Sequence, residues 1–151
     1  MNLDGCFSHK SDDWKTPKDI FKQFMEGGYI DCFPYLSKYD EFQKNYHNKK
    51  LFVNPPFSKM EQIVDWVSDQ VKNNCTVALL IPARTDTRYF HKLLSKNKQI
   101  SKIYFIQGRL HYNESGTAPF PTILIMIGND YKQQYEIISQ EDIWRCLYEK
   151  I

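Results

Sequence analysis

Residues 51–58 read Leu-Phe-Val-Asn-Pro-Pro-Phe-Ser, and this stretch decides where the chain must leave a sheet. Leu51–Val53 are apolar and strand-favouring, which predicts a short strand buried on both faces. Pro55 and Pro56 lack an N–H and have a fixed φ, so neither can continue a sheet ladder. The chain must therefore leave at Asn54, and open α/β sheets bind their ligands at the carboxyl ends of parallel strands.

This corner presents a side-chain amide, backbone carbonyls and an aromatic ring within one short turn. Amide and carbonyl oxygens accept hydrogen bonds from an exocyclic amine, and the Phe57 ring offers a stacking surface. These groups suit a flat heterocycle that carries an amino group. The alternative interpretation is a buried strand that ends in a proline turn, with Phe57 in the core.

Length and composition predict one globular domain. The chain has 151 residues, of which 42% are hydrophobic and 15% aromatic, enough for a proper core. We expect a flexible N-terminal arm at residues 1–12 and a single domain at residues 13–151. The formal net charge of +2 permits nucleic-acid binding but does not argue for it, so any basic patch must be local.

The four cysteines are widely separated, and no His lies at metal-ligand spacing beside them. We therefore expect free thiols and no metal. The start of the chain has no apolar signal-peptide region, and no apolar run approaches the roughly 20 residues that span a membrane. These features predict a soluble, cytoplasmic protein.

Strands alternate with amphipathic helices along the chain, which is the pattern of a mostly parallel α/β sheet with helices on both faces. The run at 76–81 is continuously apolar, as expected of a central strand. The last two strands form a C-terminal hairpin, which adds an antiparallel edge. The expected strands are 29–31, 51–53, 76–81, 100–106 and 121–127; the expected helices are one that Thr16 caps and that ends near Met25, one at 60–72, one that carries 89–94, and one at 141–148.

Six segments, read together, resemble the phage-type DNA N6-adenine methyltransferase (Dam) family, whose members are class I enzymes dependent on S-adenosylmethionine (SAM). The segments occur in the order of the family and cover most of the chain. They are Asp13-Trp14-Lys15-Thr16-Pro17, Asp31-Cys32-Phe33-Pro34-Tyr35, Asn54-Pro55-Pro56-Phe57-Ser58, Pro82-Ala83-Arg84-Thr85-Asp86-Thr87-Arg88-Tyr89-Phe90, Gly108-Arg109-Leu110 and Ala118-Pro119-Phe120-Pro121.

The resemblance implies a truncated class I methyltransferase (Rossmann-like) sheet, SAM as methyl donor, and N6 of a flipped adenine in DNA as acceptor. Asn54 and the Pro55 carbonyl would accept hydrogen bonds from the N6 amine. Phe57 would stack on the base, and Pro56 completes the catalytic motif. The implied cofactor-binding residues are Trp14, Thr16, Pro17, Asp31, Asp40 and Asn54.

Polar and charged residues that follow the later strands are candidates for DNA contacts. A loop after the central strand would hold phosphates or gate the flipped base. The alternative is that Thr85 or Asp86 caps the next helix and that the cations are only solvated. The candidates are Arg84, Thr85, Asp86, Arg88, Arg109 and His111, with Lys102 as an extension of the same strip.

The cofactor side is short. Residues 32–50 are too few for two further strands with their crossovers, so the acidic ribose ligand that usually follows the second strand is missing. No separate target-recognition domain fits either, so sequence specificity should be short or relaxed, or should depend on a second subunit, as in a homodimer. Two alternatives stay open: a catalytically degenerate module that binds nucleic acid or a partner, and a methyltransferase for RNA adenine or protein glutamine.

Overall fold

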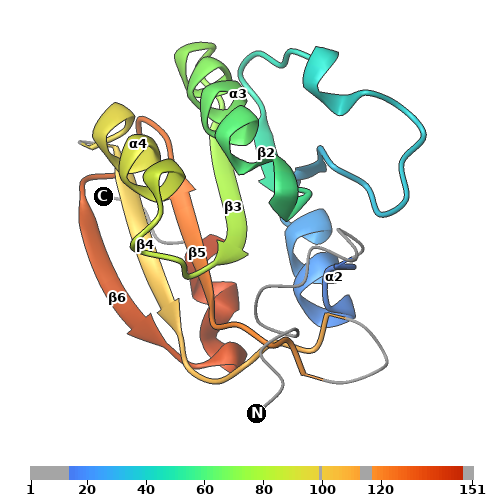
Figure 1. Ribbon diagram of the computed structural model, residues 1–151, viewed down its shortest axis with the longest axis vertical. Coiled ribbons are helices and arrows are strands. Elements are labelled where there is room, and N and C mark those ends of the chain that lie inside the picture. The colour runs from blue at the N-terminus through green and yellow to red at the C-terminus, as the bar shows by residue number, and fades with distance from the viewer. Residues whose placement is uncertain (1–13, 99, 113–116, 148–151) are drawn as a thin grey trace.

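A single six-stranded sheet, in the order β1-β2-β3-β5-β4-β6, organises the described part of the chain (Figure 1). The computed structural model describes residues 14–98, 100–112 and 117–147, so the predicted arm at 1–12 lies outside it. The strands are β1 (Ile30–Asp31), β2 (Lys50–Val53), β3 (Thr76–Pro82), β4 (Ser101–Ile106), β5 (Thr122–Ile127) and β6 (Gln134–Ile138). The helices are α2 (Lys18–Glu26), α3 (Met60–Lys72) and α4 (Arg88–Lys96), with 3-10 segments η1 (Glu41–Gln43), η2 (Phe57–Lys59) and η3 (Gln140–Leu147).

Three parallel strands form the half of the sheet that carries the Asn-Pro-Pro-Phe corner. Ile30 of β1 pairs with Leu51 of β2, and Leu51 pairs in turn with Val77 of β3. Leu51 is fully buried, as are the two residues that follow it, which confirms the buried strand predicted there. Because the strands are parallel, Asp31, Asn54 and the residues after β3 all lie along one side of the sheet, where the carboxyl ends of the strands meet.

The antiparallel pairing of the last two predicted strands is confirmed, but their predicted place at the edge of the sheet is wrong. Strand β5 lies between β3 and β4 and is antiparallel to both. All six of its residues are buried, so an inner position lets it bury both faces. The edge is instead β6, a strand that was not predicted and that runs parallel to β4.

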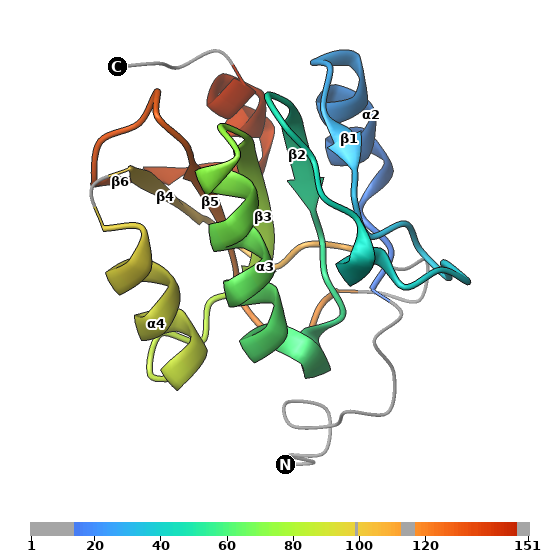
Figure 2. The same ribbon diagram turned by 90° about the horizontal axis from the view of Figure 1, so that it is seen from above.

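Helices cover both faces of the sheet, as predicted (Figure 2). On one face, α3 and α4 pack over side chains from β2, β3 and β5. On the other face, α2 and η3 pack over a second apolar cluster. Helix α3 has the predicted bounds, whereas the predicted closing helix at 141–148 is the 3-10 segment η3. This packing of helices on both faces holds the sheet in place and positions the end of it from which the polar residues extend.

Two predicted helix caps are wrong. Thr16 does not cap the first helix, because Pro17 holds the N-cap position and makes no side-chain cap hydrogen bond. Helix α4 is capped by Thr87, whose hydroxyl accepts from the Phe90 N–H at 3.4 Å, and not by Thr85 or Asp86. The Thr16 hydroxyl is therefore not used in helix capping.

The long connection between β1 and β2 is anchored to α3. The Trp66 indole N–H donates to the Lys44 carbonyl at 3.0 Å. The fully buried Gln70 side chain accepts from the Tyr46 N–H at 2.8 Å and donates to Asn45 Oδ1 at 3.2 Å. These bonds satisfy backbone groups of a segment that belongs to no strand, and they hold the segment against the sheet.

We predict that Gln70→Ala destabilises the protein, because it leaves the Tyr46 N–H of this half-buried segment without its acceptor. The expected loss in the free energy of unfolding is about 1–3 kcal/mol, measured by urea denaturation. Gln62→Ala, at an exposed position of the same helix, is the control and should change stability by less than about 0.5 kcal/mol. Equal losses in the two variants would contradict the anchoring role.

Candidate functional site

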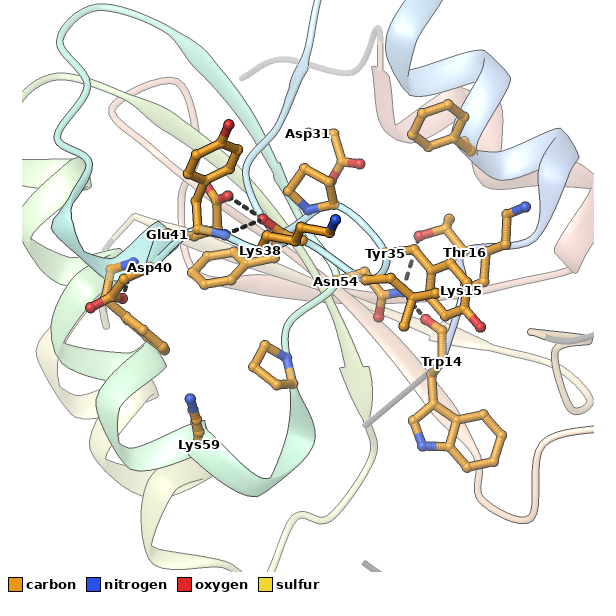
Figure 3. A pocket seen from close by; sticks show the side chains of 18 of the residues that line it. Trp14, Lys15, Thr16, Asp31, Tyr35, Lys38, Asp40, Glu41, Asn54 and Lys59 are labelled. Atoms are coloured by element: carbon orange, nitrogen blue, oxygen red, sulfur yellow. Dashed lines mark hydrogen bonds between the residues drawn. The ribbon is translucent and has the colours of Figure 1, made fainter. Parts of the chain in front are cut away.

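A pocket of about 650 Å³ opens at the carboxyl ends of β1 and β2 (Figure 3). Its walls come from the chain that leads into α2 with the first turn of α2, the loop that follows β1, and the corner that follows β2 with the start of α3. Five of the six predicted cofactor residues line it, namely Trp14, Thr16, Asp31, Asp40 and Asn54. The remaining lining residues are Lys15, Lys18, Phe21, Phe33, Pro34, Tyr35, Leu36, Ser37, Lys38, Tyr39, Glu41, Phe42, Pro56, Lys59 and Gln62.

The Asn54 amide is held in one orientation by the segment before α2. Its Nδ2 donates to the Trp14 carbonyl at 2.6 Å and to Thr16 Oγ1 at 3.0 Å (Figure 3). A carbonyl can only accept, so the amino group of the amide must face Trp14. The other end of the amide, Oδ1, is buried and has no hydrogen-bond partner among the described residues, in a residue that is 9% exposed. A buried acceptor of this kind is costly unless a ligand supplies a donor.

The rest of the corner lies around this amide. Pro55 is buried and Pro56 lines the pocket. The half-buried Phe57 is not among the residues that line the pocket. Its ring packs edge-on against Phe120 and Tyr112, at centroid distances of 5.5 and 6.3 Å. Trp14 packs edge-on against the same two rings, at 5.2 and 5.9 Å. We call the two hydrogen bonds that Asn54 donates to Trp14 and Thr16 the Asn54 clamp, and this aromatic cluster adjoins it.

Asp31 contributes a carboxyl group from the end of β1. Burial raises the pKa of Asp31 from 3.8 to about 6, and the nearby charge of Glu41 adds to the rise. A hydrogen bond from the Phe33 backbone opposes this rise in the pKa. A partly desolvated carboxylate in a pocket is stabilised by a cation, so Asp31 is suited to bind a ligand ammonium group.

Two acids of the loop after β1, Asp40 and Glu41, make hydrogen bonds and an ion pair within the loop. Asp40 lines the pocket, but its carboxylate caps η1 by accepting from the Phe42 N–H at 3.1 Å. Glu41 accepts from the Ser37 hydroxyl at 2.6 Å and pairs with Lys44 Nζ at 2.8 Å. The loop is therefore shaped by its own side chains, and the carboxylate of Asp40 is already engaged.

The predicted DNA-binding residues do not line this pocket. Thr85, Asp86 and Arg88 are exposed and Arg84 is half-buried in the segment after β3, and Arg109 and His111 are exposed after β4. Strands β3 and β4 are each antiparallel to β5, so both segments lie at the sheet edge that also carries Asn54. Pro17 also lies outside the pocket lining.

The predicted role of Lys102 in a phosphate-binding strip is wrong. Its side chain is 10% exposed, and Nζ lies 3.3 Å from a Glu136 carboxylate oxygen and 4.7 Å from the centre of the Tyr104 ring. Glu136 is also paired with Arg145 at 2.6 Å. Lys102 is therefore part of an ion-pair network that ties β4 to β6 and η3.

Sequence reasoning missed the part of the pocket wall made by the loop after β1. This segment has no helical or strand periodicity and reads as irregular, so nothing local marks residues such as Leu36, Lys38 and Tyr39 as lining the same pocket as Asn54. The available signal was chemical. Aromatic residues and lysines recur through residues 33–44, next to the strand end that carries Asp31.

Within the described residues, no group of three or more His, Cys, Asp or Glu side chains is arranged to hold a metal ion. Over the same residues, no helix has both the length and the apolarity that crossing a membrane requires.

The chain was compared with known proteins. The model of one family, DNA N-6-adenine-methyltransferase (Dam), matches residues 6–145. A search of curated proteins found no match. The matched range includes every described residue of the pocket and of the aromatic cluster.

We predict that ionisation of Asp31 lowers the free energy of unfolding as the pH rises from about 4 to about 6. Its pKa is raised in the folded protein, so the folded state binds the proton more tightly than the unfolded state over this range. The free energy of unfolding should therefore fall through this window in the wild type relative to Asp31→Asn. Urea denaturation at several pH values measures this difference.

Asp69→Asn, an exposed position on α3, is the control and should follow the wild type across the same range. A constant difference between Asp31→Asn and the wild type from pH 4 to pH 7 would contradict the prediction.

Proposed function

Because the chain belongs to the DNA N-6-adenine-methyltransferase (Dam) family, we propose that it transfers a methyl group from SAM to N6 of an adenine flipped out of DNA. The observation that carries the proposal is the clamped Asn54 amide. Its amino end is held by Trp14 and Thr16, and its buried Oδ1 is left without a donor. An exocyclic amine supplies the missing donor.

The clamp explains how a weak nucleophile becomes reactive. The lone pair of the adenine amine is conjugated with the ring, so the amine must become more tetrahedral before it can attack. Asn54 Oδ1 and the Pro55 carbonyl accept from the two N–H bonds and favour that geometry. Because the amide is already oriented, little reorganisation is needed when the substrate binds. A nitrogen that has gained a methyl group loses its proton readily, so no strong general base is required.

The pocket residues fit SAM as cofactor. Asp31 offers a half-buried carboxyl group for the ammonium of the methionine moiety, and this contact would stabilise the charged carboxylate. A volume of about 650 Å³ lies within the range of small-molecule sites. Trp14 and Thr16 line the pocket and also accept the hydrogen bonds from Asn54, so they connect the proposed cofactor site to the Asn54 amide. Asp40 lines the same pocket. When bound, SAM supplies an electrophilic methyl group.

Base flipping follows from the burial of the acceptor. Asn54 Oδ1 lies below the surface, where an adenine inside a duplex cannot reach it. Phe57 is held edge-on by Phe120 and Tyr112, and we assign it the stacking contact with the flipped base. The segments with Arg84, Arg88, Arg109 and His111 lie at the same sheet edge and are proposed to contact DNA phosphates.

The proposed setting is the cytoplasm of a bacterial host or a phage-infected cell, where DNA and SAM are both available. The described residues form the sheet and its helices, and none of them forms a separate target-recognition domain. We therefore propose that the DNA sequence recognised is short or relaxed.

We predict that Asn54→Ala strongly slows methyl transfer. The assay incubates the protein with methyl-labelled SAM and adenine-containing DNA, then identifies N6-methyladenine after digestion. Loss of the aligned acceptor should lower kcat by about 10²–10³. Asn129→Ala, which removes a surface asparagine, is the control and should keep the wild-type rate.

Label that appears in RNA or protein but not in DNA would assign the activity to one of those substrates instead. A wild-type protein that shows no binding of SAM by calorimetry would support the degenerate-module alternative and contradict the proposal.

We also predict that SAM binding depends on the ionisation of Asp31. Its pKa is raised to about 6, so affinity for SAM should increase as the pH rises from 5 to 7. Asp31→Asn should weaken binding by about tenfold or more at pH 7.5 and flatten this pH dependence. Isothermal titration calorimetry measures both effects. An unchanged affinity in the variant would exclude Asp31 from the cofactor site.

A further inference from the structure

The loop after β1 exposes large side chains at the mouth of the pocket. We call residues 34–39 the rim loop. Tyr35 is 47% exposed, Leu36 66% and Tyr39 78%, although all three line the pocket. Trp14, Phe33 and Phe42 near this site pack against other rings, whereas Phe21 of the lining is 38% exposed. Exposed rings that line a pocket are a surface for which a ligand is the natural cover.

The rim loop is held in this shape by its own contacts. The Ser37 N–H donates to the Pro34 carbonyl at 3.0 Å, and the Ser37 hydroxyl donates to the buried Glu41 carboxylate. Leu36 has a φ of 56°, a left-handed conformation that is unusual for leucine. The tyrosines are thus presented by a fixed turn, which reduces the entropy lost when a ligand stacks on them.

Cations surround the same rings. Lys15 Nζ lies 5.9 Å from the centre of the Tyr35 ring, and Lys44 Nζ lies 5.6 Å from that of Tyr39. Lys38 and Lys59 also line the pocket (Figure 3). The acids nearby are Asp31, Asp40 and Glu41, of which Asp40 caps η1 and Glu41 is buried against Lys44. The lining holds four lysines, Lys15, Lys18, Lys38 and Lys59, against these three acids, and this excess of positive charge complements a phosphate backbone.

We infer that the rim loop is a stacking platform for unpaired bases that flank the target adenine, so that the enzyme binds single-stranded DNA in preference to duplex DNA. Aromatic rings interleaved with lysines bind single strands, because each base stacks on a ring while the cations hold the phosphates. A duplex keeps its base faces stacked on one another and cannot offer them to Tyr35 or Tyr39. The inference rests on the proposed function and specifies its substrate.

Direct DNA binding tests the inference without any methyl transfer. Fluorescence anisotropy compares a labelled adenine-containing single strand with its duplex, at one salt concentration and without SAM. The wild type should bind the single strand at least about tenfold more tightly. Tyr35→Ala and Tyr39→Ala should each weaken single-strand binding by about tenfold and leave duplex binding unchanged. Tyr39→Phe keeps the ring and should bind as the wild type does.

Tyr135→Ala is the matched control, because Tyr135 is 74% exposed but lies on the edge strand β6. It should bind both DNA forms as the wild type does. Equal affinity of the wild type for the two forms, or full single-strand binding by the two alanine variants, would overturn the inference. A lower SAM affinity in those variants with unchanged DNA binding would also overturn it, because it would assign the rim loop to the cofactor.

The two proposals fail in different ways. Tyrosine-dependent single-strand binding by a protein that cannot transfer methyl groups would refute the proposed activity and keep the platform. Methyl transfer to DNA with a KM for single strands that is indifferent to both tyrosines would refute the platform alone.

Discussion

The pair of hydrogen bonds that Asn54 donates to Trp14 and Thr16 is the constraint on which the site depends. It joins the end of β2 to a segment that is 38 residues away in sequence at the Thr16 contact. The contact closes one wall of the pocket and fixes the orientation of the amide. An amide that was free to rotate would present its amino group and its oxygen about equally, and only the oxygen can accept from an amine.

The cost of this arrangement is a buried oxygen with no donor among the described residues, and a half-buried acid with a raised pKa. Both features lower the stability of the ligand-free protein, and both are relieved by ligands that bring a donor and a cation. The rest of the fold compensates through its core. Strands β3 and β5 are buried almost throughout, and Gln70 and Trp66 anchor the loop that completes the pocket.

The sequence predicted the elements whose signals are local. Helix α3 repeats its apolar residues at helical spacing, and β3 is a continuous apolar run, so both were predicted nearly to the residue. Strand β6 was missed because it is only five residues long and alternates polar and apolar residues, which is a weaker signal than the continuous apolar runs of β3 and β5.

Features that depend on contacts between residues far apart in the chain could not be predicted from the sequence. The inner place of β5 is set by its partners on both sides, and hydrophobicity alone does not distinguish it from a hairpin edge. In the site, the motif pointed to Asn54 and the strand end pointed to Asp31. The contacts of Thr16 and the capping role of Asp40 required the tertiary structure, because a threonine before Pro17 and an acid in a loop each have several common roles.

The position of β5 also has a consequence for synthesis of the chain. This strand is translated after β4 but lies between β3 and β4, so a nascent chain that has not reached residue 122 lacks the strand that joins β4 to the sheet of β1, β2 and β3. The piece that carries Asn54 then ends in the bare edge of β3, which is apolar and well suited to pair with another unfinished chain. The edge of β3 is covered only once β5 has been synthesised. Termination of translation before residue 122 would therefore leave this edge exposed and favour aggregation.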